Sequence, residues 1–457
     1  MSDQDIARIV EIQREFFSTG ITRELAFRLD ALRELRETIE SNMGRIETAL
    51  MDDLNKHPQE TYMSEVGLVL SEISYHSRHL RGWMREKRVL TPLAQFKSSS
   101  FISPEPYGVC LIMSPWNYPI QLTLAPLVGA ISAGNCAVVK PSAYAENTSH
   151  LLAQLIEKTF PKEYITVVEG GREQNSSLLD QRFDKIFFTG SVKVGKVVME
   201  AASRNLTPVT LELGGKSPVI VDATADIKLA ARRIAFGKVL NAGQTCVAPD
   251  YVLCHKSVMD KFLYCYQRAI DEFFPGGDMS EMPTIVNQKH FDRLMGLMQG
   301  CEVAVGGRSD ASRRLIEPTV LVNVDPDMPV MQEEIFGPIL PVIGYSSIDE
   351  CIRFINSRPK PLALYLFTRN SGIEGRILTS CSFGGGCIND TIVHLATSYM
   401  PFGGVGESGM GDYHGKASFD AFTHYRSILK KSNLLDLPMR YHPYEERNLR
   451  IIRMLMR

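Results

Sequence analysis

The spacing of apolar and polar positions divides the chain into a helical N-terminal part and two later parts of alternating elements. In residues 2–90, apolar residues such as Leu32, Leu35 and Ile39 recur near helical spacing between charged residues, a pattern typical of amphipathic helices. Residues 91–106 are rich in turn-forming residues, prolines among them. A turn-rich segment is therefore expected to end the helical part there.

From Tyr107 onwards, short apolar runs alternate regularly with helical stretches. Strands are expected at residues 108–113, 137–140, 164–168, 185–188 and 209–213. Helices are expected at residues 122–132, 147–158 and 194–203. Strand, helix and strand repeated at this pace imply right-handed crossovers and a parallel sheet. The pattern therefore predicts a doubly wound α/β domain.

A second series of apolar runs predicts a second α/β lobe with its own sheet. Its strands are expected at residues 217–221, 251–255, 362–368 and 385–388. No internal repeat, low-complexity tract or long linker interrupts the chain. The two lobes are therefore expected to pack closely, with a binding site between them.

The composition excludes several classes of protein. A chain of 457 residues has room for about three domains. Its content of 44% hydrophobic and 22% charged residues is that of a globular protein, not of a disordered or fibrous one. The formal net charge of −2 provides no overall field for nucleic acid. No run of ~18 apolar residues is present, so no transmembrane segment is expected.

The cysteines and the two ends of the chain indicate a compartment. Nine cysteines are scattered without paired or zinc-binding spacing, so we expect free thiols, no metal site and a reducing, cytoplasmic environment. The acidic start of the chain does not resemble a signal peptide. Residues 448–457 are basic and amphipathic. They are expected to form a docked terminal helix, with contact to a membrane surface as the alternative.

Cys246 is the main candidate for chemistry. Gly243, Thr245 and Ala248 surround it with small side chains, where a substrate carbonyl can approach closely. Glu212 supplies a carboxylate at the end of an expected strand, just before two glycines. A nucleophilic sulfur and a carboxylate base on elements that can converge suit a reaction through a covalent thioester. An electropositive, partly exposed setting would help to activate the thiol.

Asn117 lies in the sequence Ser-Pro-Trp-Asn-Tyr-Pro at residues 114–119, directly after an expected strand. The two prolines fix the backbone of this turn, which helps to aim the carboxamide at one point. A carboxamide donor in such a place suits an oxyanion hole, worth roughly 3 kcal/mol of transition-state stabilisation. Taken alone, Asn117 fits an Asx turn better.

A glycine-containing junction at residues 187–196 leads from an expected strand into a helix near Ser191. Exposed N–H groups and the positive end of the helix dipole make such a junction an anion site. The spacing from Gly190 to Gly195 and the lysine after it is that of a Walker A loop. Val197, however, replaces the hydroxyl that would bind magnesium, which argues against a P-loop nucleotide hydrolase.

Six separated segments between residues 115 and 406 together resemble the signature segments of the aldehyde dehydrogenase superfamily. They are Pro-Trp-Asn-Tyr-Pro, Phe-Phe-Thr-Gly-Ser, Leu-Glu-Leu-Gly-Gly-Lys, Gly-Gln-Thr-Cys, Gln-Glu-Glu-Ile-Phe-Gly-Pro and Pro-Phe-Gly-Gly-Val-Gly. The whole chain most resembles the class 3 branch, which acts on fatty and aromatic aldehydes. The extended string Gln-Thr-Cys-Val-Ala-Pro-Asp-Tyr contributes to that resemblance.

The resemblance implies NAD(P)-dependent oxidation of aldehydes to carboxylic acids through a thioester on Cys246. Asn117 would hold the oxyanion, and Glu212 would activate the water that hydrolyses the thioester. Tyr118 and the apolar segment 391–395 are consistent with a medium- or long-chain aliphatic, or an aromatic, aldehyde as substrate. Two alternatives stay open: transfer of the acyl group to coenzyme A, and a non-catalytic homologue that keeps the fold. His414 is a candidate substrate contact, although a structural role is favoured.

The resemblance also implies a set of residues around NAD or NADP. These are Trp116, Lys140, Ser142, Gly190, Ser191, Gly195, Leu213, Glu334 and Phe336. Many members of the family carry a glutamate right after the Lys-Pro-Ser string, where this chain has Ala143. A carboxylate there would hold the ribose 2′-hydroxyl and repel a 2′-phosphate. NADP is therefore expected to be accepted at least as well as NAD.

A division into domains follows from the same resemblance. A Rossmann-type dinucleotide-binding domain would comprise residues 1–82, 106–211 and 398–417, and a catalytic α/β domain would comprise 212–397. Residues 83–105 and 418–440 would form a small oligomerisation element, followed by a tail at 441–457. The class 3 branch implies a homodimer.

Overall fold

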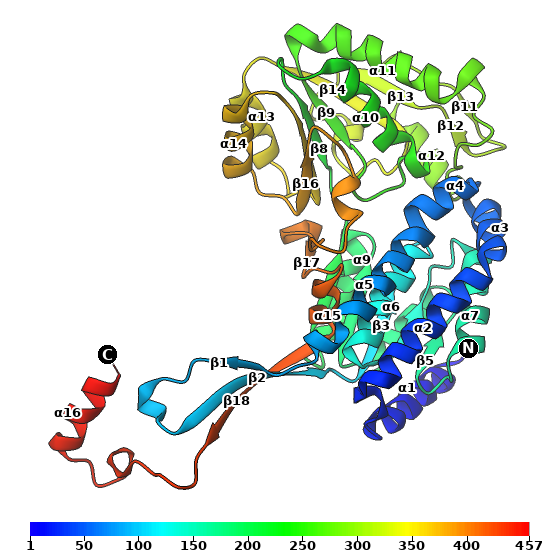
Figure 1. Ribbon diagram of the computed structural model, residues 1–457. Helices are drawn as coiled ribbons and strands as arrows, with labels where there is room; N and C mark the ends of the chain where they lie inside the picture. The colour runs from blue at the N-terminus through cyan, green and yellow to red at the C-terminus, as the bar shows by residue number, and fades with distance from the viewer. Residues whose placement is uncertain (457) are drawn as a thin grey trace.

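The computed structural model describes residues 1–456 and shows two α/β lobes, with a long arm that extends from the first lobe (Figure 1). The first lobe begins with helices α1 (Asp3–Ser18), α2 (Leu25–Ser41), α3 (Met43–Leu54), α4 (Pro58–Thr61) and α5 (Gly67–Trp83). The predicted apolar stripe faces the core, since Leu32, Leu35 and Ile39 on α2 are at most 1% exposed. Helix α5 ends at Trp83, so the prediction of helical structure up to residue 90 is wrong for the residues after Trp83.

The first lobe contains a six-stranded sheet in the order β17-β7-β6-β3-β4-β5. Its strands are β3 (Val109–Met113), β4 (Cys136–Lys140), β5 (Ile165–Val167), β6 (Lys185–Thr189), β7 (Val209–Glu212) and β17 (Gly409–Met410). Helices α6 (Gln121–Ala133), α7 (Glu146–Thr159), α8 (Arg172–Asp180) and α9 (Val192–Ser203) connect them. All neighbouring strands are parallel except β17, which is antiparallel to β7. The predicted doubly wound arrangement is confirmed.

The chain fills this sheet from the middle outwards. It runs from β3 through β4 to β5, and then returns to β6 and β7 on the other side of β3. In such sheets, ligands bind in the crevice at the carboxyl ends of the strands where the order reverses. The turn after β3 carries Asn117, and the turn after β6 carries Gly190. The topology therefore places both residues at this crevice.

The second lobe contains a seven-stranded sheet in the order β10-β13-β14-β9-β8-β15-β16. Its strands are β8 (Pro218–Val221), β9 (Tyr251–His255), β10 (Glu302–Val305), β13 (Thr319–Val322), β14 (Ile339–Tyr345), β15 (Ala363–Phe367) and β16 (Gly385–Ile388). Its helices are α10 (Ile227–Val239), α11 (Met259–Phe273), α12 (Gln288–Leu297), α13 (Ile348–Asn356) and α14 (Ser371–Ser380). A separate hairpin pairs β11 (Ser309–Asp310) with β12 (Leu315–Ile316). The predicted second lobe with its own sheet is confirmed.

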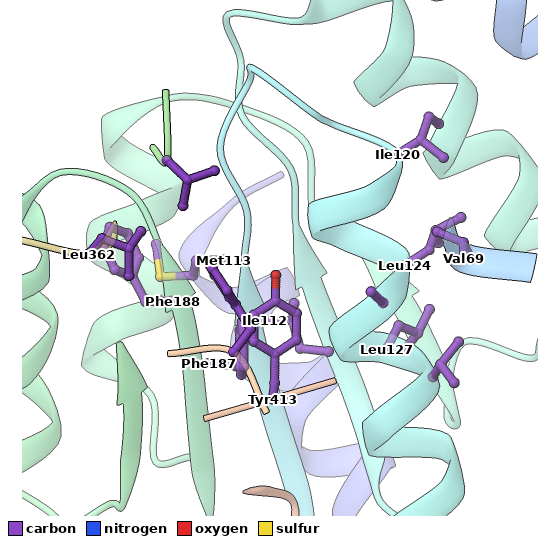
Figure 2. Packing of buried hydrophobic residues seen from close by; sticks show 14 of the residues in the cluster. Val69, Ile112, Met113, Ile120, Leu124, Leu127, Phe187, Phe188, Leu362 and Tyr413 are labelled. Carbon is purple, nitrogen blue, oxygen red and sulfur yellow. The ribbon is translucent and has the colours of Figure 1, made fainter. Parts of the chain in front are cut away.

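A single hydrophobic cluster extends from the first lobe to the crevice and reaches the second lobe (Figure 2). Ile112 on β3 and Phe187 on β6 belong to it, together with Leu362 from the second lobe and Tyr413 from the chain after β17. All four are at most 1% exposed. Because protein interiors are close-packed, these contacts fix the strand ends relative to the second lobe.

The arm is a three-stranded antiparallel sheet of β1 (Lys87–Val89), β2 (Ser98–Pro106) and β18 (Thr423–Lys431), in the order β1-β2-β18. The expectation of a turn-rich segment over 91–106 is wrong for β2, which pairs with β18 along all nine residues. Its prolines are tolerated because β1 covers only positions 100–102 of β2. Pro104 and Pro106 thus lie where one side of the strand has no neighbour.

Helix α16 (Glu446–Leu455) lies at the far end of the arm, beside the short 3-10 helix Leu93–Gln95 (Figure 1). None of its residues is buried. The expected terminal helix is present, but it contacts the arm and buries none of its residues. Among residues 1–456, no helix combines the length and apolar character needed to cross a membrane.

Removing residues 441–457 is expected to leave the stability of the two lobes nearly unchanged, with a loss of less than about 1 kcal/mol, because α16 buries no side chain. Thermal unfolding of the full and shortened chains measures this. Leu32→Ala provides the matched comparison, since truncation of this fully buried side chain is expected to cost about 2–5 kcal/mol. A loss of similar size in the shortened chain would show that the tail packs on the lobes.

Candidate active site

A large cleft lies between the two lobes at the crevice of the first sheet. Most of the residues expected from the sequence line it together: Trp116, Asn117, Gly190, Ser191, Glu212, Leu213, Cys246, Glu334 and Phe336. The first lobe contributes the ends of β3, β6 and β7, and the second lobe contributes the thiol and the loop of Glu334.

Cys246 lies where this cleft meets a second cavity of about 760 Å³. The second cavity is mostly apolar and contains Tyr118, as expected. Its other walls include Met63, Leu68, Phe236, Leu240, Ile392, Val393, Leu395 and Phe402. The Tyr118 hydroxyl lies 2.6 Å from the Thr245 hydroxyl. A molecule in the apolar cavity and one in the larger cleft can thus approach the same sulfur from two sides.

The loop before Cys246 has an unusual backbone. Asn241, Ala242 and Gly243 have φ of 50°, 52° and 70°, in the left-handed region. A Cβ on Gly243 would lie only 2.4 Å from the carbonyl oxygen of Gly337, so only glycine allows this close approach. Such strain persists only where the surroundings fix it. Here the Asn241 carboxamide donates to the carbonyl of Asn117 at 2.7 Å.

The Asn117 side chain is 2% exposed, and its Nδ2 donates to the carbonyl of Gln244 at 2.8 Å. The turn that carries it is held by a buried ion pair between Lys56 and Glu65, with an Nζ–Oε1 distance of 2.5 Å. Lys56 Nζ also donates to the Asn117 carbonyl at 3.1 Å, and Glu65 accepts from the backbone N–H of Ile120 at 2.8 Å. This pair was not found from the sequence, because no motif marks a lysine and a glutamate nine positions apart.

Glu212 ends β7, and both of its carboxyl oxygens are buried without a hydrogen-bond partner among the described residues. Burial raises the pKa of this carboxyl well above its usual range, and the nearby Asp412 adds to the shift. An unpartnered buried carboxyl is costly in a folded protein and calls for an explanation. Its position in the wall of the cleft supplies one, since a bound molecule can reach it.

The protein groups around the Cys246 thiol do not provide the electropositive setting that would help to activate it. Burial raises its pKa, and the carboxyl groups of Glu334 and Glu212 raise it further. The side chain is nevertheless half-buried rather than sealed, because it forms part of both cavity walls. Without a ligand the sulfur is therefore held as a neutral thiol.

The junction after β6 has the geometry of an anion site. Ser191 caps α9, its hydroxyl accepting from the N–H of Val194 at 3.4 Å, and the first residues of the helix line the cleft. The helix dipole and free N–H groups there favour a phosphate. Gly195 does not line the cleft, but a Cβ there would lie 2.6 Å from Leu213. Gly195 thus lets α9 pack closely against Leu213.

Glu334 reaches from the second lobe to the first. A Cβ on Gly214 would lie 2.0 Å from its carboxyl oxygen, so the side chain fits only over a glycine. Burial and the neighbouring Asp250 raise its pKa to about 8. Asp250 and Lys216 hold this loop in place: Asp250 accepts from the N–H of Ile335 at 2.9 Å, and Lys216 Nζ donates to the carbonyl of Glu333 at 2.8 Å.

Two aromatic residues form an edge of the cleft. The ring of Phe336 lies 5.4 Å from that of Trp116 in a T-shaped arrangement, and Phe336 itself has a φ of 52°. Lys140 and Ser142, by contrast, are not brought to the cleft wall. Lys140 is 3% exposed, and its Nζ donates to the carbonyl of Pro141 at 2.6 Å. Burial lowers its pKa to about 8.

The site has no cluster of His, Cys, Asp or Glu side chains that could hold a metal ion, and none occurs elsewhere in residues 1–456. The donor set instead fits a dinucleotide: glycines where the backbone must approach a ligand, a helix N-terminus, and a carboxylate across the cleft.

Comparisons with known proteins give the same result over the whole chain. Residues 1–428 match the aldehyde dehydrogenase family. The 4,4'-diaponeurosporen-aldehyde dehydrogenase of Staphylococcus aureus is 49% identical over 437 residues, 94% of this chain and 95% of that protein. Human aldehyde dehydrogenase family 3 member B1 is 48% identical, and the match covers 97% of this chain and 96% of that protein. The dimeric NADP-preferring aldehyde dehydrogenase of Canis lupus familiaris is 46% identical, with coverage of 96% of this chain and 98% of that protein.

Solved structures agree with this assignment. The substrate-bound state of Staphylococcus aureus AldH has a TM-score of 0.96 and 47% identity, covering 98% of this chain and 99% of that one. Betaine aldehyde dehydrogenase from Staphylococcus aureus in complex with NAD+ has a TM-score of 0.85 and 28% identity, covering 95% of this chain and 89% of that one. The chain therefore belongs to the aldehyde dehydrogenase family, in its class 3 branch, and is an enzyme that oxidises aldehydes to carboxylic acids with NAD or NADP.

Proposed function

We propose that the oxidation proceeds through a thioester on Cys246, with Asn117 and Glu212 as its partners. The observation that carries this proposal is the position of the thiol, which lines both the apolar cavity and the larger cleft. An aldehyde in the apolar cavity would present its carbonyl carbon to the sulfur. NAD or NADP, when bound in the larger cleft, supplies the nicotinamide that accepts a hydride.

The Cys246 thiol would first lose its proton to water in the cleft, and attack by the resulting thiolate forms a carbon–sulfur bond and places negative charge on the former carbonyl oxygen. The Asn117 carboxamide has two N–H groups, of which one donates to Gln244, so the second remains for this oxyanion. The backbone N–H of Cys246 would be the other donor. Collapse of this oxyanion expels a hydride from the same carbon and leaves the thioester. A preorganised donor of this kind is worth roughly 3 kcal/mol.

Hydrolysis of the thioester needs a base, and we propose Glu212 for this role. Its buried carboxyl has no protein partner, so it is free to bind a water molecule in the cleft. The carboxylate would take a proton as the water oxygen attacks the acyl carbon, and the sulfur would leave as the thiolate. The carboxylic acid would then be released. Because this base faces water rather than a thiol acceptor, hydrolysis is favoured over transfer to coenzyme A.

We propose NAD or NADP contacts for Trp116, Leu213, Glu334 and Phe336, which line the larger cleft with the Gly190–Ser191 junction. Gly195 would act by letting α9 pack closely against Leu213. Lys140 and Ser142, at the end of β4, would act outside the wall of this cleft. The dinucleotide-binding domain is proposed at residues 1–82, 106–211 and 398–417, and the catalytic domain at 212–397.

The substrate class is proposed from the second cavity. Its walls are almost wholly apolar, and burial of apolar surface favours a ligand of the same character. Medium- or long-chain aliphatic, or aromatic, aldehydes are therefore the proposed substrates, with Tyr118 as a wall residue. A cytoplasmic location is also proposed, since all nine cysteines are free. Recovery of the enzyme in an oxidising compartment upon cell fractionation would contradict that location.

Cys246→Ala is expected to reduce aldehyde oxidation by at least about a thousandfold, because no other group can form the thioester. Glu212→Gln is expected to keep the first step and lose the second. Rapid mixing with octanal should then give one burst of reduced nicotinamide per active site, followed by slow turnover. In the wild type, steady-state turnover should rise with pH as the Glu212 carboxyl, whose pKa is raised, loses its proton.

Glu157→Gln, a change at an exposed glutamate on α7, is the control for these kinetics. A Cys246→Ala variant that keeps more than about a tenth of the activity would overturn the thioester proposal. Formation of an acyl-CoA on addition of coenzyme A would instead favour the acylating reaction over hydrolysis.

The wild type is expected to use NADP at least as well as NAD, because the exposed residue after Ser142 is alanine rather than a carboxylate. Ala143→Glu should raise the KM for NADP about tenfold by charge repulsion, with little change for NAD. Steady-state kinetics with both cofactors measure this, and Ala143→Gln separates charge from size. A wild type that strongly prefers NAD would show that Ala143 does not set the preference.

We also propose a homodimer in which residues 83–105 and 418–440 form the contact. The arm exposes the edge strand β18, including Leu429 at 47% exposure, and unpaired strand edges are usually covered. Sedimentation equilibrium should give twice the chain mass of 51.1 kDa. Leu429→Lys should shift the protein towards single chains, whereas Tyr264→Lys on α11 should not. A wild type that sediments as one chain would refute the dimer.

A further inference from the structure

A small polar cavity adjoins the proposed aldehyde cavity. Leu68, Gln121, Leu395, Ala396 and His414 line both, so the two spaces are neighbours that share a wall. The character of the lining changes across it. The walls near Cys246 are almost wholly apolar, whereas the adjoining cavity contains the side chains of Ser71, Glu72, Thr397 and Ser398. A chain that entered from Cys246 would pass from apolar to polar surroundings.

His414 stands at this boundary with an unused hydrogen-bonding atom. The residue is 7% exposed, and its Nε2 is buried without a partner among the described residues. An unsatisfied buried nitrogen normally lowers stability, so a retained one calls for a ligand or a water as its partner. His394 also has an unpartnered Nε2, but it lines neither cavity. His414 is thus the histidine that both lines the two cavities and has an unpartnered ring nitrogen.

The His414 ring is held in one orientation. The backbone N–H of His414 donates to the Ser418 hydroxyl at 2.8 Å, and the backbone N–H of Gly415 donates to the Glu72 carboxylate at 2.5 Å. The imidazole stacks on Phe402 with a centroid distance of 5.5 Å and an interplanar angle of 27°. His414 has a φ of 80°, which only a fixed surrounding sustains in a residue other than glycine. The free nitrogen is therefore preorganised.

Charges in the polar cavity restrict what can bind. Burial opposes ionisation of Glu72, but the hydrogen bond and charge interaction with His76, the charge interaction with His414 and the hydrogen bond from Ser398 outweigh this and lower its pKa to about 2. The carboxylate is therefore negative at neutral pH. His76 Nε2 lies 3.2 Å from it, and the Ser398 hydroxyl donates to it at 2.7 Å. Burial also lowers the pKa of His414, which keeps the imidazole neutral. A negatively charged ligand would be repelled by the Glu72 carboxylate.

We propose that His414 and the polar cavity form a subsite for an uncharged hydroxyl group at the far end of the substrate, so that the enzyme accepts hydroxyl-bearing aldehydes such as ω-hydroxy fatty aldehydes. A hydroxyl both donates and accepts, so it can pair with Nε2 in either neutral tautomer. This inference rests on the proposed function, because it takes the apolar cavity beside Cys246 as the aldehyde site.

The test compares pairs of aldehydes of equal length, one ending in a methyl and one in a hydroxyl group, over a series of chain lengths. For each pair, the ratio of kcat/KM values is measured in the wild type and in His414→Phe. Phenylalanine keeps the stacking ring but cannot form the hydrogen bond. At the length that reaches the subsite, the ratio of hydroxyl to methyl substrate should fall about fivefold in His414→Phe. The loss should appear in KM more than in kcat, because the contact is remote from the reacting carbon.

Two further variants keep the result interpretable. His414→Asn retains a polar group and tolerates positive φ, so it should recover part of the hydroxyl preference. His394→Phe removes the other unpartnered histidine and should leave the ratio unchanged. Taking the ratio cancels any general loss of activity or stability in a variant.

An unchanged ratio in His414→Phe at every length, with methyl-terminated aldehydes still oxidised, would overturn the subsite alone. Failure of the wild type to oxidise any of the methyl-terminated aldehydes would instead count against the proposed aldehyde cavity. A stronger effect with ω-carboxy than with ω-hydroxy aldehydes would contradict the charge argument from Glu72.

Discussion

The buried ion pair between Lys56 and Glu65 is the interaction on which the geometry of the site depends. Both side chains are fully inaccessible to solvent, yet they come from the helical N-terminal part and not from either sheet. Lys56 also donates to the Asn117 carbonyl, and Glu65 also accepts from the N–H groups of Ile120 and Gln121 at the start of α6. Removing one partner of such a pair leaves a buried charge, which typically costs 3–5 kcal/mol. The turn with Asn117 therefore cannot shift independently of the N-terminal helices.

The same turn connects to the loop of the thiol. Asn241 donates to the Asn117 carbonyl, and Asn117 in turn donates to the carbonyl of Gln244. These two bonds join the first lobe to a strained segment of the second, where left-handed residues precede Cys246. Strain of this kind lowers stability and needs compensation elsewhere. The ion pair, the carboxamides and the packed cluster around Tyr413 supply it, so the thiol and the oxyanion donor form one rigid unit.

Sequence patterns predicted those parts of the fold in which local character and tertiary role coincide. Each strand of the first sheet except β17 is a short apolar run, and each was found. Strands β10, β13 and β14 were missed. Strand β14 contains Pro341 and Gly344, and such residues are usually read as breaks. Strand β2 was taken for turns for the same reason. Its prolines are accommodated only because β1 is short, a fact of tertiary structure that composition does not reveal.

The residues of the site also divide into those that sequence motifs identified and those that only the fold brings together. Residues within dense motifs, such as Asn117, Glu212 and Cys246, were found because several unusual residue types stand together. The walls of the apolar cavity were mostly not found, because Met63, Leu68 and Leu240 are ordinary apolar residues on helices or loops distant in sequence. The surroundings of the thiol were also not predictable from the sequence. The groups that shift its pKa most after burial are two carboxyls, which only the folded chain brings close.

The charge interaction between Glu212 and Cys246 sets the order in which the two groups act in the proposed reaction. Glu212 raises the pKa of Cys246, and since the interaction is mutual, a negative sulfur also disfavours ionisation of Glu212. While the sulfur carries charge, the glutamate is held protonated, and a protonated carboxyl cannot activate water. Once the sulfur is acylated it is neutral, and this part of the penalty on the carboxylate is removed. The base thus becomes stronger at the stage at which hydrolysis requires it, although burial still keeps its pKa raised. The lack of a hydrogen-bond partner for the buried Glu212 carboxyl lowers the stability of the fold. The same arrangement suits a group whose charge must depend on the state of the neighbouring sulfur.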